Sequence, residues 1–190
     1  MTKRGFTSDW FSENIPTWER LIIPLLPKTV VRCLEIGSWE GRSACWIVDN
    51  ILQHHPDSHL DCVDLWPNLQ EQERLFDRNL STEPKVTKHK GFSINFLVPL
   101  IDQAAVYDFI YVDGDHRGEM VFTDSTLAWH CLKVGGVMAM DDYIYDGWEI
   151  AGLPKPKLPI DAFLAIHANE IRVLEKAHQV IVQKTTPGSY

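Results

Sequence analysis

Five short apolar runs that alternate with helix-like stretches constrain the fold of this chain more than any other feature. The runs are Val30–Ile36, Leu60–Leu65, Lys85–His89, Tyr107–Val112 and Gly136–Met140. The first, fourth and fifth are almost continuously apolar, which is typical of strands that are covered on both faces. Strands that alternate with helices need crossover connections, and such connections build a parallel sheet. The sequence therefore predicts an α/β fold with a doubly wound sheet.

The stretches between these runs have apolar residues at helical spacing. We expect helices over Ser43–His54, Asn68–Leu80, Ile94–Ile101, Gly118–Leu132 and Ile160–Asn169. Near the C-terminus, Ile171–Leu174 and Val180–Gln183 resemble two β-runs, which predicts an antiparallel hairpin.

The chain divides into a leading segment and one domain. Residues 1–29 predict an N-terminal helical extension that prolines interrupt, and residues 30–190 predict a single domain. Within that domain, residues 142–158 form a long loop rich in Gly, Pro, Tyr and Trp. Loops of this length are more often functional than idle, so we expect an active-site loop there.

Charge and composition exclude several classes of protein. The 190 residues carry a net charge of −8, which argues against a nucleic-acid partner because phosphate contacts need clustered Lys and Arg. No apolar run is long enough to span a membrane, and the N-terminus lacks the apolar stretch of a signal peptide. The four cysteines form no C-x-x-C pair. We therefore expect a cytoplasmic protein with reduced, buried thiols.

Polar residues follow every one of the five predicted strands. Ligands of open α/β sheets bind outside the carboxyl ends of the strands, so these residues are candidates for one common site. They are the Glu35–Ser43 turn, Asp64, the Gly91–Ser93 segment, Asp113–His116 and Asp141–Tyr143. Packing alone does not explain their convergence on one edge.

The first turn has features of a cofactor site. Gly37 and Gly41 give a G-x-x-x-G pattern, which permits a tight turn and the close approach of a ligand. The pattern is not the G-x-G-x-x-G of dinucleotide folds, which counts against an NAD-dependent oxidoreductase. Glu35 precedes the turn, and its carboxylate suits a ligand with an ammonium group. Asp64 can accept hydrogen bonds from ribose hydroxyls.

The residues that follow the second and third runs have two interpretations each. Leu65 and Trp66 can lie against an adenine ring or pack in the core. Ser93 can contact the edge of an adenine, or it can cap the helix that is expected to begin at Ile94.

Four carboxylates crowd the ends of the fourth and fifth strands. Asp113, Asp115, Asp141 and Asp142 would repel one another, and some of their pKa values must rise unless a cation intervenes. Oxygen ligands suit a hard divalent cation such as Mg²⁺, Ca²⁺ or Mn²⁺. The alternative is that these acids cap helices and stay solvated.

These motifs resemble the class I S-adenosylmethionine-dependent methyltransferases. C-L-E-I-G-S-W-E-G-R-S-A is similar to their first motif, and V-D-L is similar to the acid that ends their second strand. Y-D-F-I-Y-V-D-G-D-H and G-G-V-M-A-M-D-D-Y resemble the metal-dependent O-methyltransferases, which include catechol, caffeoyl-CoA and macrolide-sugar enzymes. The resemblance covers roughly residues 30–145. It implies a Rossmann-like sheet of seven strands, which the C-terminal hairpin would complete.

The resemblance also implies a set of site residues. The metal ligands would be Asp113, Asp141 and Asp142, with Asp115 close by and Mg²⁺ as the expected ion. His116 would be the general base, because its near-neutral pKa suits proton abstraction. The cofactor S-adenosyl-L-methionine would contact residues of the first turn and of three further strand ends. These residues are Glu35, Gly37, Ser38, Trp39, Gly41, Ser43, Asp64, Leu65, Ser93 and Asp113.

The expected reaction is methyl transfer to a hydroxyl of a small-molecule acceptor, a phenol or a sugar. Tyr143, Tyr145 and Trp148 could cover that acceptor, or they could simply pack within the loop. The seven other histidines, His178 among them, show no ligand spacing and are interpreted as solvent-facing or hydrogen-bonded.

Two rival functions and one question of assembly stay open. The chain could be a metal-independent methyltransferase with a nitrogen acceptor, or a non-catalytic module that binds S-adenosylmethionine. The chain has no obvious separate substrate domain, so a homo-oligomer in which a second copy completes the acceptor pocket also remains open.

Overall fold

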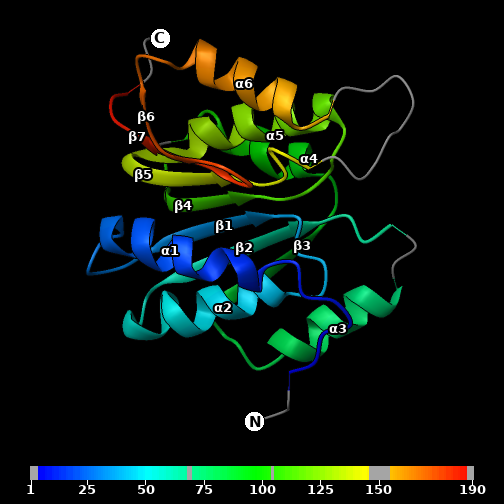
Figure 1. The fold of residues 1–190 in the computed structure, drawn as a ribbon. Coiled ribbons are helices and arrows are strands. Elements are labelled where there is room, and N and C mark those ends of the chain that lie inside the picture. Colours follow the sequence, from blue (N-terminus) through cyan, green and yellow to red (C-terminus); the bar gives the residue numbers. More distant parts are fainter. Residues whose placement is uncertain (1–3, 68–69, 104, 146–154, 188–190) are drawn as a thin grey trace.

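The computed structural model describes residues 4–67, 70–103, 105–145 and 155–187. Seven strands form one sheet in the order β3-β2-β1-β4-β5-β7-β6 (Figure 1). The strands are β1 (Arg32–Ile36), β2 (His59–Asp64), β3 (Val86–Lys90), β4 (Tyr107–Val112), β5 (Leu132–Met140), β6 (Ile171–Lys176) and β7 (Val180–Lys184). Strands β1 to β5 pair in parallel, whereas β7 is antiparallel to both β5 and β6. The predicted fold class, including the C-terminal antiparallel hairpin, is confirmed.

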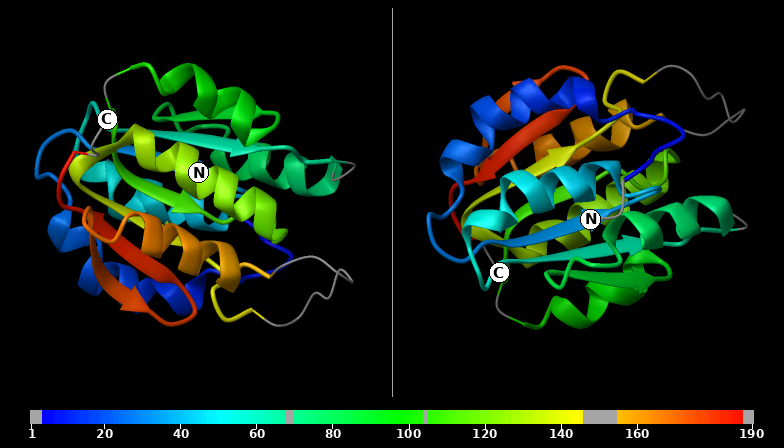
Figure 2. Two further views of the ribbon diagram at one scale, coloured as in Figure 1. Left: turned by 90° about the horizontal axis from the view of Figure 1, so that it is seen from above. Right: turned by 90° about the horizontal axis from the view of Figure 1, so that it is seen from below.

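Helices cover both faces of the sheet, as a doubly wound fold requires. Helices α1, α2 and α3 lie on one side, and α4, α5 and α6 lie on the other (Figures 1 and 2). The α-helices are α1 (Ile15–Leu21), α2 (Arg42–Asn50), α3 (Gln70–Leu80), α4 (Ser93–Leu97), α5 (Gly118–Cys131) and α6 (Lys157–Ile166). Short 3₁₀ helices span Ser12–Asn14, Ile23–Leu25, Leu52–His54 and Val98–Leu100.

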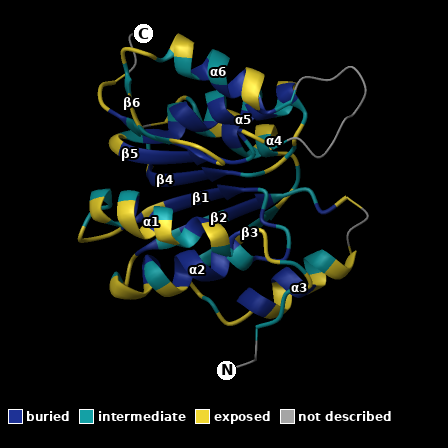
Figure 3. Ribbon diagram, viewed as in Figure 1, coloured by how far each residue is buried: buried dark blue, intermediate teal, exposed yellow. Residues whose placement is uncertain are grey.

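The apolar side chains form two core clusters, one on each face of the sheet. Successive residues of β1 serve opposite faces, so Cys33 packs in the cluster beneath α2 and Leu34 in the cluster beneath α5. All residues of β4, the central strand, are buried (Figure 3). This burial explains why Tyr107–Val112 is an almost continuous apolar run.

The strand β5 begins earlier than the sequence pattern predicts. The expected run starts at Gly136, but β5 starts at Leu132, directly after α5. The register against β4 shifts there, because Tyr107 pairs with Leu132 whereas Phe109 pairs with Val137. Gly135, with φ of +86°, lies within this irregular stretch, which a hydropathy pattern cannot reveal.

The N-terminal segment belongs to the same core as the sheet. Trp18 of α1 is fully buried, and its ring packs edge-on against Phe109 and Tyr111 of β4 at centroid distances of 5.0 and 4.8 Å. The guanidinium of Arg4 pairs with Asp49 of α2. The first described residues are therefore fixed to the same face as α2.

Two further expectations concern cysteines and membranes. All four cysteines are buried and unbonded, in agreement with the expected reduced thiols. Among the described residues, no helix has the length and apolar character needed to cross a bilayer.

Candidate active site

The carboxyl ends of four neighbouring strands are joined by a row of backbone hydrogen bonds. Gly37 donates to Val63 at 2.8 Å, Asp113 donates to Ile36 at 2.8 Å, and Asp141 donates to Val112 at 3.0 Å. The structure therefore brings the first turn and the acids that follow β4 and β5 to one edge of the sheet, as the sequence predicts.

Gly37 is required where the first turn approaches the start of the loop after β4. Its φ is +86°, and a Cβ atom built there would lie 1.9 Å from the carbonyl oxygen of Asp113. Only glycine fits so close to another backbone. The candidate cofactor turn and the start of the acidic loop after β4 are thus in direct contact.

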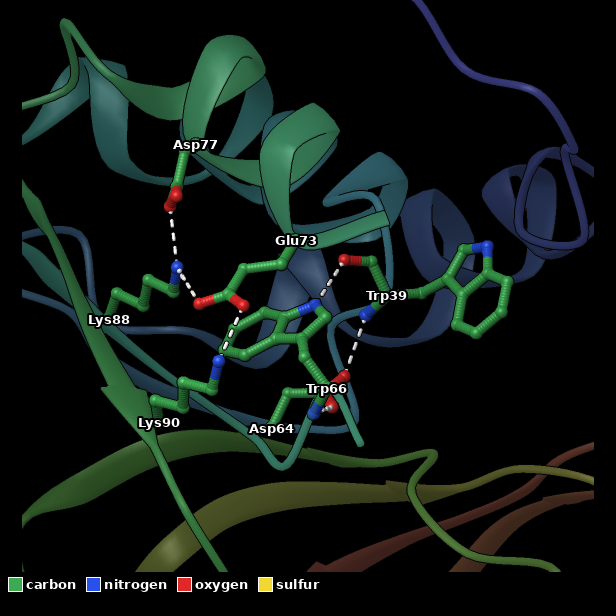
Figure 4. A network of polar contacts seen from close by, with 7 residues as sticks. All are labelled: Trp39, Asp64, Trp66, Glu73, Asp77, Lys88 and Lys90. Carbon is green, nitrogen blue, oxygen red and sulfur yellow. Dashed lines mark hydrogen bonds and ion pairs between the residues drawn. The ribbon is translucent and has the colours of Figure 1, made fainter. Parts of the chain in front are cut away.

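Asp64 fixes the shape of this turn. Its Oδ2 atom accepts a hydrogen bond from the backbone N–H of Ser38 at 2.8 Å. The same atom accepts a second one from the N–H of Trp39 at 2.9 Å (Figure 4). Its Oδ1 atom accepts from the N–H of Trp66 at 2.8 Å. A carboxylate has about four acceptor positions, so about one position on this half-buried side chain remains for a ligand hydroxyl.

The structure corrects one interpretation of the residues after β2. Trp66 is buried, its ring packs on Phe76 at 4.9 Å, and the ammonium of Lys88 lies 4.7 Å from its centroid. Its Nε1–H donates to the carbonyl of Trp39 at 2.8 Å (Figure 4). Trp66 therefore packs in the core and is not free to stack on an adenine, whereas Leu65 beside it is half-buried.

Glu35 is a carboxyl group without enough hydrogen-bond partners. Its side chain is fully buried, and its Oε1 atom has no hydrogen-bond partner within the described part of the chain. The thiol of Cys62 lies 3.6 Å from Oε2. Burial raises the pKa of Glu35 to about 7, although the nearby hydroxyls of Ser43 and Ser38 act in the opposite direction. A cationic group placed beside Oε1 would relieve this unfavourable burial.

Ser93 does not cap helix α4. It is the first residue of that helix, and its hydroxyl donates at 2.5 Å to the buried carboxylate of Asp124 in α5. Burial raises the pKa of Asp124 to about 6. The contact fixes the N-terminal end of α4 against α5, which the sequence pattern did not indicate.

Two of the predicted metal ligands share one tyrosine hydroxyl. The Tyr111 hydroxyl lies 2.9 Å from Asp113 Oδ2 and also contacts Asp141 Oδ2. One hydroxyl proton can serve only one of these oxygens. Burial, and then the charges of Asp141 and Asp142, raises the pKa of Asp113 well above its usual value. Burial also raises the pKa of Asp141. A shared proton or a cation is needed here.

Asp142 lies between this pair and His116. Its backbone has a φ of +61°, and its Oδ2 atom is 2.9 Å from Nε2 of His116. The hydrogen bond with Asp142 raises the pKa of His116 above its usual value, while burial acts in the opposite direction. Asp113, His116 and Asp142 each offer one donor atom, and these atoms all lie within 4.8 Å of one another.

Asp115 does not join this group in the structure. Its carboxylate forms an ion pair with the guanidinium of Arg117 at 2.6 Å and accepts the Arg117 backbone N–H at 2.8 Å. This pairing lowers the pKa of Asp115, even though burial acts against it. Asp115 lines the same small pocket as Asp113 and Asp142.

Sequence reasoning missed two residues of the turn between β6 and β7. Gln179 is buried, and its Nε2 donates to Asp141 Oδ2 at 3.0 Å. His178 Nε2 lies 3.4 Å from Asp141 Oδ1. The predicted C-terminal hairpin could have pointed to these two residues. An antiparallel strand beside β5 places the residue before Val180 next to the residue after Met140.

The loop after β5 is described only in part. Tyr143 is buried, and its hydroxyl donates to Asp161 at 3.0 Å, so it packs within the protein. The Tyr145 ring lies 5.3 Å from that of His116, at the site. Residues 146–154, and with them Trp148, lie outside the described residues.

Solved structures of other proteins share the fold of this chain. A putative O-methyltransferase from Klebsiella pneumoniae is 17% identical, with a TM-score of 0.71 over 95% of this chain and 84% of that chain. TomG, an O-methyltransferase of tomaymycin synthesis from Streptomyces achromogenes solved with SAM, is 18% identical, with a TM-score of 0.63 over 82% of this chain and 73% of that chain.

A third match was solved with a metal ion. MycE, a methyltransferase of the mycinamycin pathway in complex with Mg and SAH, is 16% identical, with a TM-score of 0.62. The match covers 96% of this chain but only 51% of MycE, so this chain spans about half of that protein. At these identities the three structures establish the fold alone.

Sequence comparison supplies the family. No curated protein matches the chain significantly. A family model described as a methyltransferase domain matches residues 34–143, which is more than half of the chain and includes every strand end discussed above except the C-terminal hairpin. The chain therefore belongs to the methyltransferase domain family, and its predicted identity as a methyltransferase with the class I fold is confirmed.

Proposed function

We propose that this protein transfers a methyl group from S-adenosyl-L-methionine to a hydroxyl oxygen of a small-molecule acceptor, a phenol or a sugar, with the help of a divalent cation. The observation that carries the proposal is the juxtaposition of Asp113, Asp141, Asp142 and His116 with the Gly37 turn at one sheet edge. The complexes of TomG with SAM and of MycE with Mg and SAH agree with it.

The first turn fits the cofactor. S-adenosylmethionine supplies a sulfonium methyl group that is already electrophilic, together with an ammonium group and a ribose. Glu35, whose Oε1 atom lacks a partner among the described residues, would hold the ammonium. The remaining acceptor position of Asp64 would take a ribose hydroxyl. The turn from Gly37 to Gly41, with Ser38 and Trp39 between them, would accommodate the methionine part.

The other cofactor contacts remain proposals of the same kind. Ser43 is buried close to Glu35, where its hydroxyl helps to lower the pKa of that carboxyl group. Leu65 and Ser93 follow β2 and β3 and would flank the adenine. Asp113 would face both the cofactor and the acceptor, because its backbone touches Gly37.

The acidic group fits a cation by the chemistry of its donors. Asp113, Asp141 and Asp142 are crowded carboxylates, and two of them compete for one tyrosine proton. A bound divalent cation would lower the pKa of an acceptor hydroxyl. These three side chains are the proposed ligands, and their oxygen atoms suit a hard ion such as Mg²⁺.

His116 is the proposed general base. Its Nε2 atom lies 2.9 Å from Asp142 Oδ2, and its side chain is 40% exposed, so an acceptor can reach it. Neutralising the neighbouring carboxylates would lower the pKa of this imidazole again, because Asp142 is the main cause of its rise. The imidazole would then be free to accept the proton that the hydroxyl loses.

Substitution of Asp141 tests this function. We expect Asp141→Ala to abolish turnover while the affinity for S-adenosylhomocysteine stays within a few fold, because Asp141 would hold the cation and not the cofactor. A chelator should abolish turnover of the wild type. The exposed Asp57→Ala variant is the matched control. Loss of S-adenosylhomocysteine binding in Asp141→Ala, or turnover that a chelator leaves unchanged, would contradict the proposal.

A further inference from the structure

The turn between β6 and β7 is built into the candidate metal site. Val180 pairs with Met140 in the antiparallel register, so the turn residues lie beside Asp141 and Asp142. The Tyr143 N–H donates to the carbonyl of His178 at 2.9 Å. The turn is thus tied to the loop that carries two of the proposed ligands.

Gln179 holds this turn from the buried side. Its Nε2 donates to Asp141 Oδ2 at 3.0 Å, and its Oε1 accepts the indole N–H of Trp18 at 2.7 Å. The Oδ2 atom of Asp141 is also in contact with the Tyr111 hydroxyl. The Oδ1 atom is therefore the one that is left for the open side, where it accepts only the Asp142 N–H, at 2.8 Å, among the described backbone groups.

His178 approaches that second oxygen from the solvent side. Its Nε2 atom lies 3.4 Å from Asp141 Oδ1, and its side chain is 49% exposed, so it has room to adjust. Asp141, Asp142 and His178 each offer one donor atom within 4.8 Å of the others. Ligands of one small ion with bonds near 2.1 Å lie roughly 3 to 4 Å apart, so a small closure of these side chains suffices.

We infer that His178 is a nitrogen ligand of the cation, and that the site consequently prefers a transition-metal ion such as Mn²⁺ to Mg²⁺. The inference rests on the proposed function, which places a cation at these carboxylates. Both ions favour oxygen ligands, but Mg²⁺ takes them almost exclusively, whereas Mn²⁺, as a first-row transition metal, accepts an imidazole nitrogen beside its oxygen ligands more readily than Mg²⁺ does. A mixed set of carboxylates and one imidazole therefore discriminates between the two ions.

Measurements of metal affinity, which do not depend on turnover, test this inference. Mn²⁺ is titrated into the purified protein and followed by the electron spin resonance of the free ion, and Mg²⁺ affinity is measured by competition. We expect His178→Ala to weaken Mn²⁺ binding about tenfold or more and Mg²⁺ binding less than about twofold. His178→Asn should show the same two changes as His178→Ala. The exposed His54→Ala variant should bind both ions as the wild type does.

A spectroscopic readout identifies the ligand directly. Spin-echo modulation of bound Mn²⁺ should show coupling to an imidazole nitrogen in the wild type and in His116→Ala, and the coupling should vanish in His178→Ala. Two results would overturn this inference and leave the proposed function intact. One is an unchanged ratio of Mn²⁺ to Mg²⁺ affinity in His178→Ala, and the other is nitrogen coupling that disappears in His116→Ala instead. Failure of the wild type to bind either ion overturns the cation of the proposed function as well.

Discussion

The buried carboxyl group of Glu35 makes a stability prediction that can be worked out from the structure. Burial raises its pKa from the ordinary 4.5 to about 7 in the folded protein. Between these two values the native state keeps the proton while the unfolded chain loses it. The free energy of unfolding therefore decreases as pH rises from about 4.5 to about 7, and it is constant with respect to this group above that range.

The size of the effect follows from the shift. One pKa unit corresponds to about 1.4 kcal/mol, so the shift of Glu35 amounts to about 3 kcal/mol of stability lost across this pH range. Glu35→Gln has nearly the same shape but does not ionise, so this part of the decrease should disappear. Buried Asp124 also lowers the free energy of unfolding as pH rises. Because Asp124 is present in both proteins, its contribution cancels when they are compared.

Urea unfolding at pH 4.5 and pH 7.5 measures the difference. Between these pH values, the free energy of unfolding of the wild type should decrease by about 3 kcal/mol more than that of Glu35→Gln. The absolute stability of the variant can be lower, because its amide has few partners, but the difference in pH dependence is independent of that. Identical pH dependence in the two proteins would refute the assignment of a raised pKa to Glu35.

Ligand binding gives a second readout of the same residue. If Glu35 must ionise to hold an ammonium group, the affinity for S-adenosylhomocysteine should fall by up to about tenfold per pH unit below pH 7. Glu35→Gln should bind more weakly and without this pH dependence. A wild-type affinity that does not change between pH 5 and pH 7 would exclude Glu35 from the ammonium site.

Two further substitutions distinguish the proposed role of His116 as general base from that of Gln179, which would orient a metal ligand. His116→Ala should lower kcat about 10²- to 10⁴-fold while metal affinity is unchanged, and an unaltered pH–rate profile would remove His116 as the base. Gln179→Leu should weaken metal affinity about 10- to 100-fold, because it removes the hydrogen bond that orients Asp141. Gln183→Leu on the adjoining strand β7 is the control, since its side-chain Nε2 donates to the Gly135 carbonyl at 2.9 Å and not to Asp141, and an equal loss there would contradict a role specific to Gln179.

The sequence predicts the sheet and the position of its functional edge well. Tyr107–Val112 has the bounds that the apolar run predicts, because a strand buried on both faces leaves no ambiguity of pattern. The positions of Glu35 and Asp113 at the functional edge follow from the same reasoning, since the carboxyl ends of parallel strands all lie at one edge of the sheet. The hairpin also appears where its β-runs indicate.

The contacts that complete the site could not be predicted in this way. Gln179 and Trp18 are far apart in the chain, and their hydrogen bond depends on how α1 packs on the sheet. Asp64 accepts three backbone N–H groups because Trp39 and Trp66 adopt positive φ values, which the one-letter code does not reveal for tryptophan. His178 enters the site only through the register of β7 against β5.

The most direct test of the whole account is a crystal structure of the protein soaked with Mn²⁺ and S-adenosylhomocysteine, with data collected at the manganese absorption edge. The account predicts an anomalous peak within bonding distance of Asp113, Asp141 and Asp142, and a nucleoside whose ribose contacts Asp64. Water alone among the three carboxylates, with no nucleoside beside the Gly37 turn, would contradict it.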